Sequence, residues 1–123
     1  MSRYTVSLDR REARNAALAG GKGASLGKLM KLGFPVPRGF VLSTRAFRRY
    51  LATFAITEIT QKRRWLKSEL ALIRSFIQDS PMPRPLEHAI LKAARKLRYP
   101  VAVRSSMIGE DAGGASFAGQ LDT

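Results

Sequence analysis

Two segments of the chain carry residue types that could bind a phosphate group. The first, Gly20–Ser25, combines three glycines with Lys22 at the start of a helical pattern. Glycines allow the backbone to approach a ligand closely, and the amides at a helix N-terminus favour an anion. The P-loop pattern is not matched, because Ala16 and Gly23 occupy the positions of its first glycine and its serine or threonine. A plain flexible turn explains this segment equally well.

The second segment, Val101–Ser106, is an apolar stretch that leads into Arg104. An arginine at the end of a buried strand presents a fixed guanidinium, which suits bidentate phosphate binding. The small-residue loop beyond it could fold over a polyphosphate and donate backbone hydrogen bonds; it comprises Gly113, Gly114, Ala115, Ser116, Phe117, Ala118 and Gly119. A tight hairpin that uses its glycines for turn geometry is the alternative.

Other residues that could do chemistry lack the partners that chemistry needs. His88 is the only histidine and lies in a helical pattern, where a surface or half-buried position is the simpler interpretation. Ser105 and Ser106 have no visible histidine–acid partnership that would make a nucleophile. Glu110 and Asp111 form a lone acidic pair, which does not make a metal site. We therefore predict no catalytic residue and no metal ligand in this chain.

The charge of the chain is its outlying bulk property. Among 123 residues, 22 are Lys or Arg and 9 are acidic, a formal net charge of +13. Such a surface attracts polyanions without choosing among them. An RNA-binding face with Trp65 or Tyr50 for stacking is one interpretation, and solvent-facing sides of amphipathic helices are the other. The basic clusters are Arg45, Arg48, Arg49; Lys62, Arg63, Arg64, Lys67; and Lys92, Arg95, Lys96, Arg98.

The composition also excludes several classes of protein. The chain has no cysteine, so disulfide frameworks, thiolate metal sites and cysteine nucleophiles are ruled out. The first eight residues lack the apolar core of a signal peptide, and no apolar run approaches the roughly 18 residues of a membrane span. We therefore expect a cytoplasmic protein without a membrane partner.

Hydrophobic periodicity predicts an α+β fold with short strands around a helical layer. Strands are expected at 4–8, 40–42 and 101–103, with a loop at 9–15. Gly33 is expected to cap one helix, Ser43 or Thr44 to begin the next, and Pro85 to lie in a first turn. The expected helices place their apolar residues at Ala24, Leu26, Leu29, Met30 and Leu32; Phe47, Tyr50, Leu51 and Phe54; Ile59, Leu66, Leu70, Ile73 and Ile77; and Leu86, Ala89, Ile90, Ala93, Ala94 and Leu97.

Taken together, the two segments resemble the phosphoenolpyruvate synthase and pyruvate phosphate dikinase family. The stretches Gly20–Gly27 and Leu32–Val41 resemble the start of that family. Val101–Ser106, with Ala115–Gln120 and then Asp122 and Thr123, is similar to its phosphate loop. Rifampicin phosphotransferase shares both motifs. The resemblance spans almost the whole chain, although Met107–Gly109 replaces the smaller and more polar residues expected there.

The resemblance implies a nucleotide site of the ATP-grasp type, of which residues 1–123 would form the first subdomain. By that analogy Lys22 contacts the ATP phosphates and Arg104 binds phosphate at the transferring end. Gly119 and Thr123 would lie along the loop that covers the nucleotide. In this family a phosphoryl group passes from ATP to a histidine on another domain and then to pyruvate or a similar acceptor. Magnesium is the expected cofactor beside ATP, with its ligands outside this chain.

The second half of the ATP-grasp fold and the phosphohistidine domain are not recognised in these residues. We therefore expect the chain alone to bind ATP weakly and to transfer no phosphoryl group, and a complementing chain could supply the rest. The alternative is a catalytically inactive basic module that binds nucleic acid or a protein partner. The first hypothesis predicts that substitution of Lys22 or Arg104 weakens ATP binding. The alternative predicts that neutralising Arg63, Arg64 and Lys67 matters more.

Overall fold

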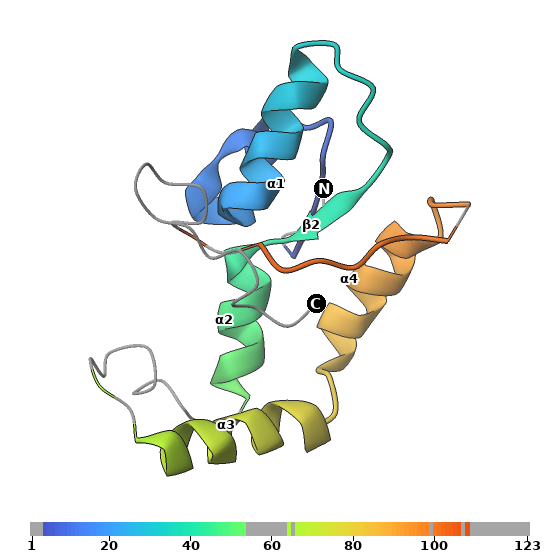
Figure 1. Ribbon diagram of the computed structural model, residues 1–123. Coiled ribbons are helices and arrows are strands. Elements are labelled where there is room, and N and C mark those ends of the chain that lie inside the picture. The colour runs from blue at the N-terminus through green and yellow to red at the C-terminus, as the bar shows by residue number, and fades with distance from the viewer. Residues whose placement is uncertain (1–3, 54–63, 65, 99, 107, 109–123) are drawn as a thin grey trace.

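The computed structural model describes residues 4–53, 64, 66–98, 100–106 and 108. The elements confirm the predicted α+β class, with a small sheet beside a layer of helices (Figure 1). In chain order they are β1 (Thr5–Ser7), the 3₁₀ helix η1 (Arg11–Arg14), α1 (Ala16–Lys31), β2 (Phe40–Leu42), α2 (Thr44–Ala52), α3 (Lys67–Asp79) and α4 (Arg84–Ala94).

The two strands confirm the first two predicted strand positions. β1 and β2 pair antiparallel with Val6 opposite Val41. Backbone hydrogen bonds extend the pairing at both ends, from Leu8 N–H to the Gly39 carbonyl at 3.0 Å and from Ser43 N–H to the Tyr4 carbonyl at 2.9 Å. Val6 and Leu8 are buried as alternation predicts, and Thr5 on the opposite side is buried as well. The face of Thr5 is buried only in part, because Ser7 on the same face is exposed.

Signals that act within a few residues predicted three of the helix ends correctly. Gly33 follows α1 with φ +89°. Its N–H donates to the Met30 carbonyl while Phe34 N–H donates to the Leu29 carbonyl, both at 3.1 Å, which is the Schellman pattern. Ser43 Oγ caps α2 by accepting from Ala46 N–H at 3.3 Å. A proline stands in the first turn of α4, where its missing N–H does no harm.

The expected loop at 9–15 was wrong, because Arg11–Arg14 forms the 3₁₀ helix η1. The first long helix also begins earlier than its glycines suggested. Asn15 caps it at Ala16, with its side chain accepting from Ala17 N–H at 3.0 Å. A charged stretch can form a helical turn when a tertiary neighbour covers it, and η1 packs along α1.

The buried face of α1 is built from small residues and not from leucines. Ala19, Gly23 and Gly27 recur every four residues and are buried together with Gly20, Gly21 and Ala24. Leu29 is 40% exposed and Leu32 is 73% exposed, so the predicted apolar stripe fails at these two positions. Added Cβ atoms at Gly23 and Gly27 would meet Val41 and Ala13, which shows that β2 and η1 approach the backbone closely. The small residues of this face therefore allow α1 to pack closely against both β2 and η1.

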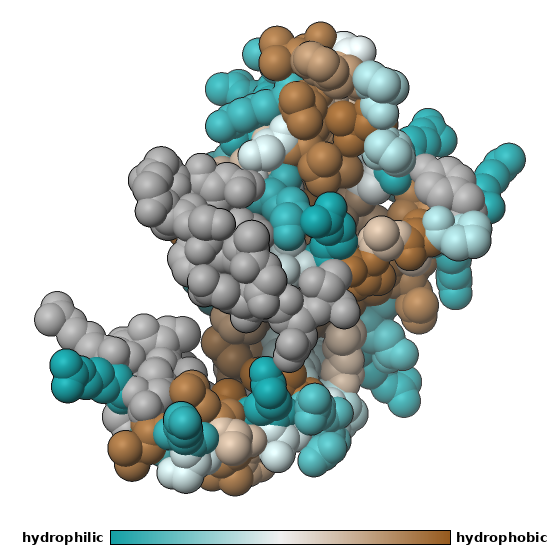
Figure 2. Space-filling view, viewed as in Figure 1, coloured by the Kyte–Doolittle hydropathy of each residue, from teal (hydrophilic) through white to brown (hydrophobic). Residues whose placement is uncertain are grey.

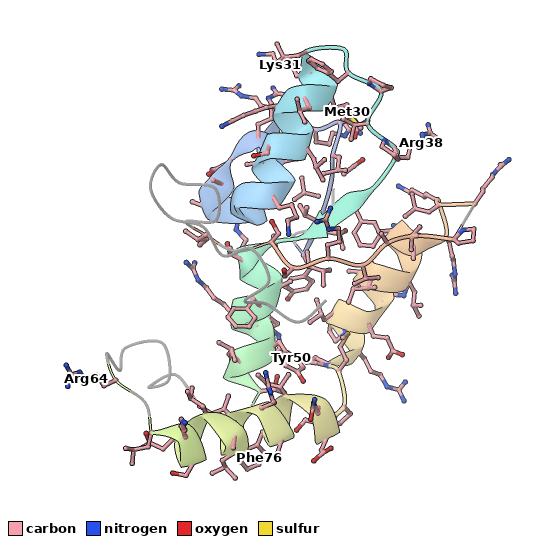
Figure 3. All side chains as sticks on the ribbon, in the orientation of Figure 1. Met30, Lys31, Arg38, Tyr50, Arg64 and Phe76 are labelled. Atoms are coloured by element: carbon pink, nitrogen blue, oxygen red, sulfur yellow. The ribbon has the colours of Figure 1, made fainter. Side chains whose placement is uncertain are left out.

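Helices α2, α3 and α4 form an open U below the sheet (Figure 1). Tyr50 connects α2 to α3, because its hydroxyl donates a hydrogen bond to the Ile77 carbonyl at 2.7 Å (Figure 3). In the part of the chain that the structure describes, α3 has no buried residue. Its apolar side chains instead gather on the surface, as the brown patch over α3 in Figure 2 shows. The predicted helix is confirmed at Leu70, Ile73 and Ile77, although this stripe does not enter a core. Leu66 stands just before the helix, and Ile59 lies outside the described residues.

The predicted third strand does not form. Within the described residues, 100–106 runs without a β-ladder, and Val103 is 82% exposed. A short apolar run becomes a strand only when its backbone pairs with another strand, and the sheet of the described residues contains β1 and β2 alone. None of the helices in the described ranges is long and apolar enough to cross a membrane.

Asp9 at the end of the sheet offers a test of surface electrostatics. A hydrogen bond from the Ser7 side chain lowers the pKa of Asp9 below its ordinary 3.8, and the charges of Arg10 and Arg38 act in the same direction. A lowered folded-state pKa contributes stability above the unfolded pKa and loses it as the pH falls through the folded value. We expect Asp9→Asn to reduce the free energy of unfolding at neutral pH by less than about 1 kcal/mol, because solvent screens exposed groups. Urea titrations at neutral pH and at pH values below the lowered pKa should show the difference vanish in acid.

Candidate functional site

The two segments singled out by their chemistry meet in the structure. Ser106 Oγ accepts a hydrogen bond from Gly23 N–H at 2.9 Å and donates one to the Ala19 carbonyl at 2.7 Å. These contacts join positions 83 and 87 residues apart in the chain. The glycine-rich turn that carries Lys22 and the segment that carries Arg104 are therefore one site in space.

A kink in α1 receives the serine. Gly20 has φ +74° and ψ 171°, far from helical values, within an otherwise helical stretch. In an unbroken helix Gly23 N–H would donate to the Ala19 carbonyl four residues earlier. Here both groups bond to Ser106 Oγ instead. The hydroxyl is thus inserted into the helical hydrogen-bond ladder, a recognised cause of kinks.

The glycines of the turn are required by close contacts and by backbone geometry. A Cβ built on Gly20 would have the Ser106 Oγ at 2.5 Å and the Ser106 carbonyl carbon at 2.6 Å. A Cβ on Gly23 would meet Val41 Cγ1 at 2.7 Å. The turn is therefore a packed surface, and the interpretation as a plain flexible turn does not describe it.

Lys22 and Arg104 lie within two residues of this junction along the chain. Lys22 is half-buried and directly precedes Gly23, whose amide bonds to Ser106. Arg104 is exposed and lies two residues before Ser106, so its Cα is within about 7 Å of the Ser106 Cα along the backbone. Both side chains are long enough to reach a ligand bound over the junction. The predicted strand that would have fixed Arg104 is replaced by this contact with α1.

The remaining predicted site residues lie outside the described residues. They are Gly113, Gly114, Ala115, Ser116, Phe117, Ala118, Gly119 and Thr123, and the acidic pair Glu110 and Asp111 lies there too.

Sequence reasoning missed the role of Ser106. It was considered only as a nucleophile, whereas the structure uses its hydroxyl to bridge two backbone groups of α1. The backbone carbonyl of Ala19 and the side chain of Val41, which touches the Gly23 position, were missed as well. The one local signal was the density of glycines at 20, 21 and 23, which indicates that another segment packs closely on this backbone but does not indicate which segment.

The described residues of this junction do not assemble a metal site. Among the described residues, no group of three or more His, Asp or Glu side chains could hold a metal. The donors that magnesium prefers, carboxylates, are therefore not assembled in these ranges. His88 lines an open hollow on α4 with Arg84, Glu87 and Leu91, which shares no residue with either segment. Its exposed helical position agrees with the simpler interpretation made from the sequence.

Comparison with known proteins identifies the class to which this site belongs. Residues 16–123 match a family described as the AMP/ATP-binding domain of pyruvate phosphate dikinase. This match covers both segments of the site and most of the chain. The chain therefore belongs to that family, as its motifs predicted.

The relatives with this similarity are named phosphoenolpyruvate synthases or phosphotransferases. The chain is 40% identical to a phosphoenolpyruvate synthase of Aeropyrum pernix over 86% of its own length and 15% of the relative. It is 36% identical to a probable phosphoenolpyruvate synthase of Methanocaldococcus jannaschii, over 98% of this chain and 12% of the relative. A rifampicin phosphotransferase of Streptomyces sviceus is 35% identical over 98% of this chain and 15% of the relative. The chain spans between 12% and 20% of the length of such relatives.

Proposed function

We propose that the chain is the ATP-binding portion of a phosphotransferase of the phosphoenolpyruvate synthase type, with the first subdomain of an ATP-grasp-type fold in residues 1–123. The observation that carries the proposal is the Ser106 bridge, because it joins the segment that contains Arg104 to the segment that contains Lys22. A family that binds AMP or ATP over residues 16–123 supports the same ligand. Cytoplasmic activity on a metabolite such as pyruvate is part of this proposal.

The proposed roles follow from charge and reach. Lys22 is a compact cation beside backbone amides of a kinked helix, a combination that suits a phosphate oxygen. Arg104 offers a planar guanidinium that can hold two oxygens of one phosphate. The loop 113–119 and Thr123 would cover the nucleotide. Because the described residues do not fit a magnesium site, the ions that accompany ATP would take their protein ligands elsewhere.

Substitution of the two cations tests the proposal directly. We expect Lys22→Ala and Arg104→Ala each to weaken magnesium-ATP binding by about 10- to 100-fold, since each removes a charge-assisted hydrogen bond worth about 1.5–3 kcal/mol. Isothermal titration calorimetry or an amide NMR titration of the chain at moderate salt measures this. In the NMR titration, shifts should centre on Lys22, Arg104 and 113–119.

The control variant removes positive charge from another place, three charges against one in each single variant. The triple variant Arg63→Ala/Arg64→Ala/Lys67→Ala should leave ATP affinity within about threefold of the unmodified chain. If the triple variant loses more affinity than either single variant, the site assignment is wrong.

The exposed basic side chains favour a second candidate, a basic module that binds nucleic acid or a protein partner. Arg45, Arg48 and Arg49 on α2, and Lys92, Arg95 and Lys96 around the end of α4, are all exposed. This candidate predicts binding to RNA that falls steeply with salt and depends on such clusters and not on Lys22. It also shares one expectation with the first, that the chain alone does not turn over ATP. A steady-state phosphate-release assay on the purified chain checks that expectation.

A further inference from the structure

We propose that Ser106 is a positioning residue of the nucleotide site, which fixes the Arg104 segment against the kink that carries Lys22. The inference rests on the proposed function, because it assigns a role at the same site. It goes beyond that proposal by naming the group that joins the two halves of the site.

The geometry of the bridge defines a single orientation for the serine hydroxyl. Its hydrogen is committed to the Ala19 carbonyl at 2.7 Å and its lone pair to Gly23 N–H at 2.9 Å. Both distances lie at the favourable centre of their ranges for O–H···O and N–H···O bonds. A side chain held by a donor and an acceptor at once leaves its own backbone little freedom. The position of residue 106 relative to α1 is therefore well determined.

The segment before Ser106 has little else to hold it in place. Residues 101–104 are exposed, and the described part of the chain gives them no β-ladder. Arg104 is two residues from the bridge, so the bridge limits how far its guanidinium can move from Lys22. Without the serine hydroxyl, Gly23 N–H could donate to the Ala19 carbonyl as in an ordinary helix, since Gly20 tolerates helical angles. The segment would then be released and Arg104 with it.

The decisive experiment compares three variants of the chain by calorimetric titration with magnesium-ATP. We expect Ser106→Ala to weaken binding about tenfold, and Ser106→Thr, which keeps the hydroxyl, to stay within about threefold of the unmodified chain. Ser105→Ala is the matched control, the same change one position away, and should have little effect. Circular dichroism confirms that each variant keeps its helices.

Two further measurements separate positioning from a general loss of structure. In an Arg104→Ala background, Ser106→Ala should cause at most a twofold further loss of affinity, because the serine acts through the arginine. The carbon chemical shifts of Gly20 should move toward helical values in Ser106→Ala without ligand. An equal effect of Ser106→Ala in both backgrounds, or equal effects at 105 and 106, overturns the inference. If the unmodified chain shows no binding of ATP, the proposed function is contradicted instead. The Gly20 chemical shifts then still report whether the Ser106 bridge holds the kink in α1.

Discussion

Gly20→Ala should lower the free energy of unfolding by about 3 kcal/mol, one of the largest effects expected of any single substitution here. Two causes add. The backbone of Gly20, at φ +74° and ψ 171°, lies in a region that is essentially restricted to glycine, at a cost of about 1–3 kcal/mol for other residues. The new methyl would also overlap Ser106, and overpacking of this kind costs about 1–3 kcal/mol. Urea unfolding followed by circular dichroism measures the loss.

Gly33→Ala is the matched control for this prediction. Gly33 also has positive φ, at +89°, but a Cβ there meets nothing within 4 Å. The control therefore reports the backbone cost alone, about 1 kcal/mol. Equal losses for the two variants would contradict the contact with Ser106.

Leu86→Ala should have the second large effect, a loss of about 2–4 kcal/mol. Leu86 is 3% exposed and, with Ala89, forms the buried side of α4, the helix that contacts β1. Truncating a buried leucine removes its transfer free energy and leaves a cavity. In a domain whose whole stability is about 5–15 kcal/mol, such a loss is a substantial part. Thermal and urea unfolding measure it.

Leu91→Ala provides the comparison within the same helix. Leu91 is 47% exposed, so the same truncation should change stability by less than about 1 kcal/mol. If Leu91→Ala proves as costly as Leu86→Ala, the face of α4 that packs on the sheet has been assigned wrongly. Because α4 precedes the segment that carries Arg104, weakened ATP binding is also expected for Leu86→Ala.

The sequence predicted those features that depend on neighbours along the chain. Gly33 after α1 and Ser43 before α2 are caps whose partners lie within four residues, so their types were sufficient. The family motifs around Lys22 and Arg104 were recognisable for a related reason, since each is continuous in the chain. Their meeting was implied by the family resemblance and is seen in the Ser106 bridge.

Features that depend on distant neighbours were predicted less well. Periodicity counted Leu29 and Leu32 as core, but a helix packed closely through Ala19, Gly23 and Gly27 leaves them outside. Apolar character at 101–103 suggested a strand, but no property of those residues reveals whether their backbone pairs with another strand. The role of Ser106 depends on a kink 86 positions earlier, at Gly20, for which the local sequence holds no direct signal.

The insertion of Ser106 into α1 has a consequence for how easily the site can open. When the Ser106 side chain leaves, Gly23 N–H can donate to the Ala19 carbonyl, and the serine hydroxyl can form hydrogen bonds with water. Polar contacts are usually costly to break because a buried donor or acceptor is left without a partner. This exchange leaves neither the Gly23 N–H nor the Ala19 carbonyl in that state. The exchange needs a backbone rotation at Gly20, the residue type for which such rotation is least hindered. That rotation also moves residues 16–19 relative to the rest of α1, so opening of the junction is coupled to the packing of η1 on this helix.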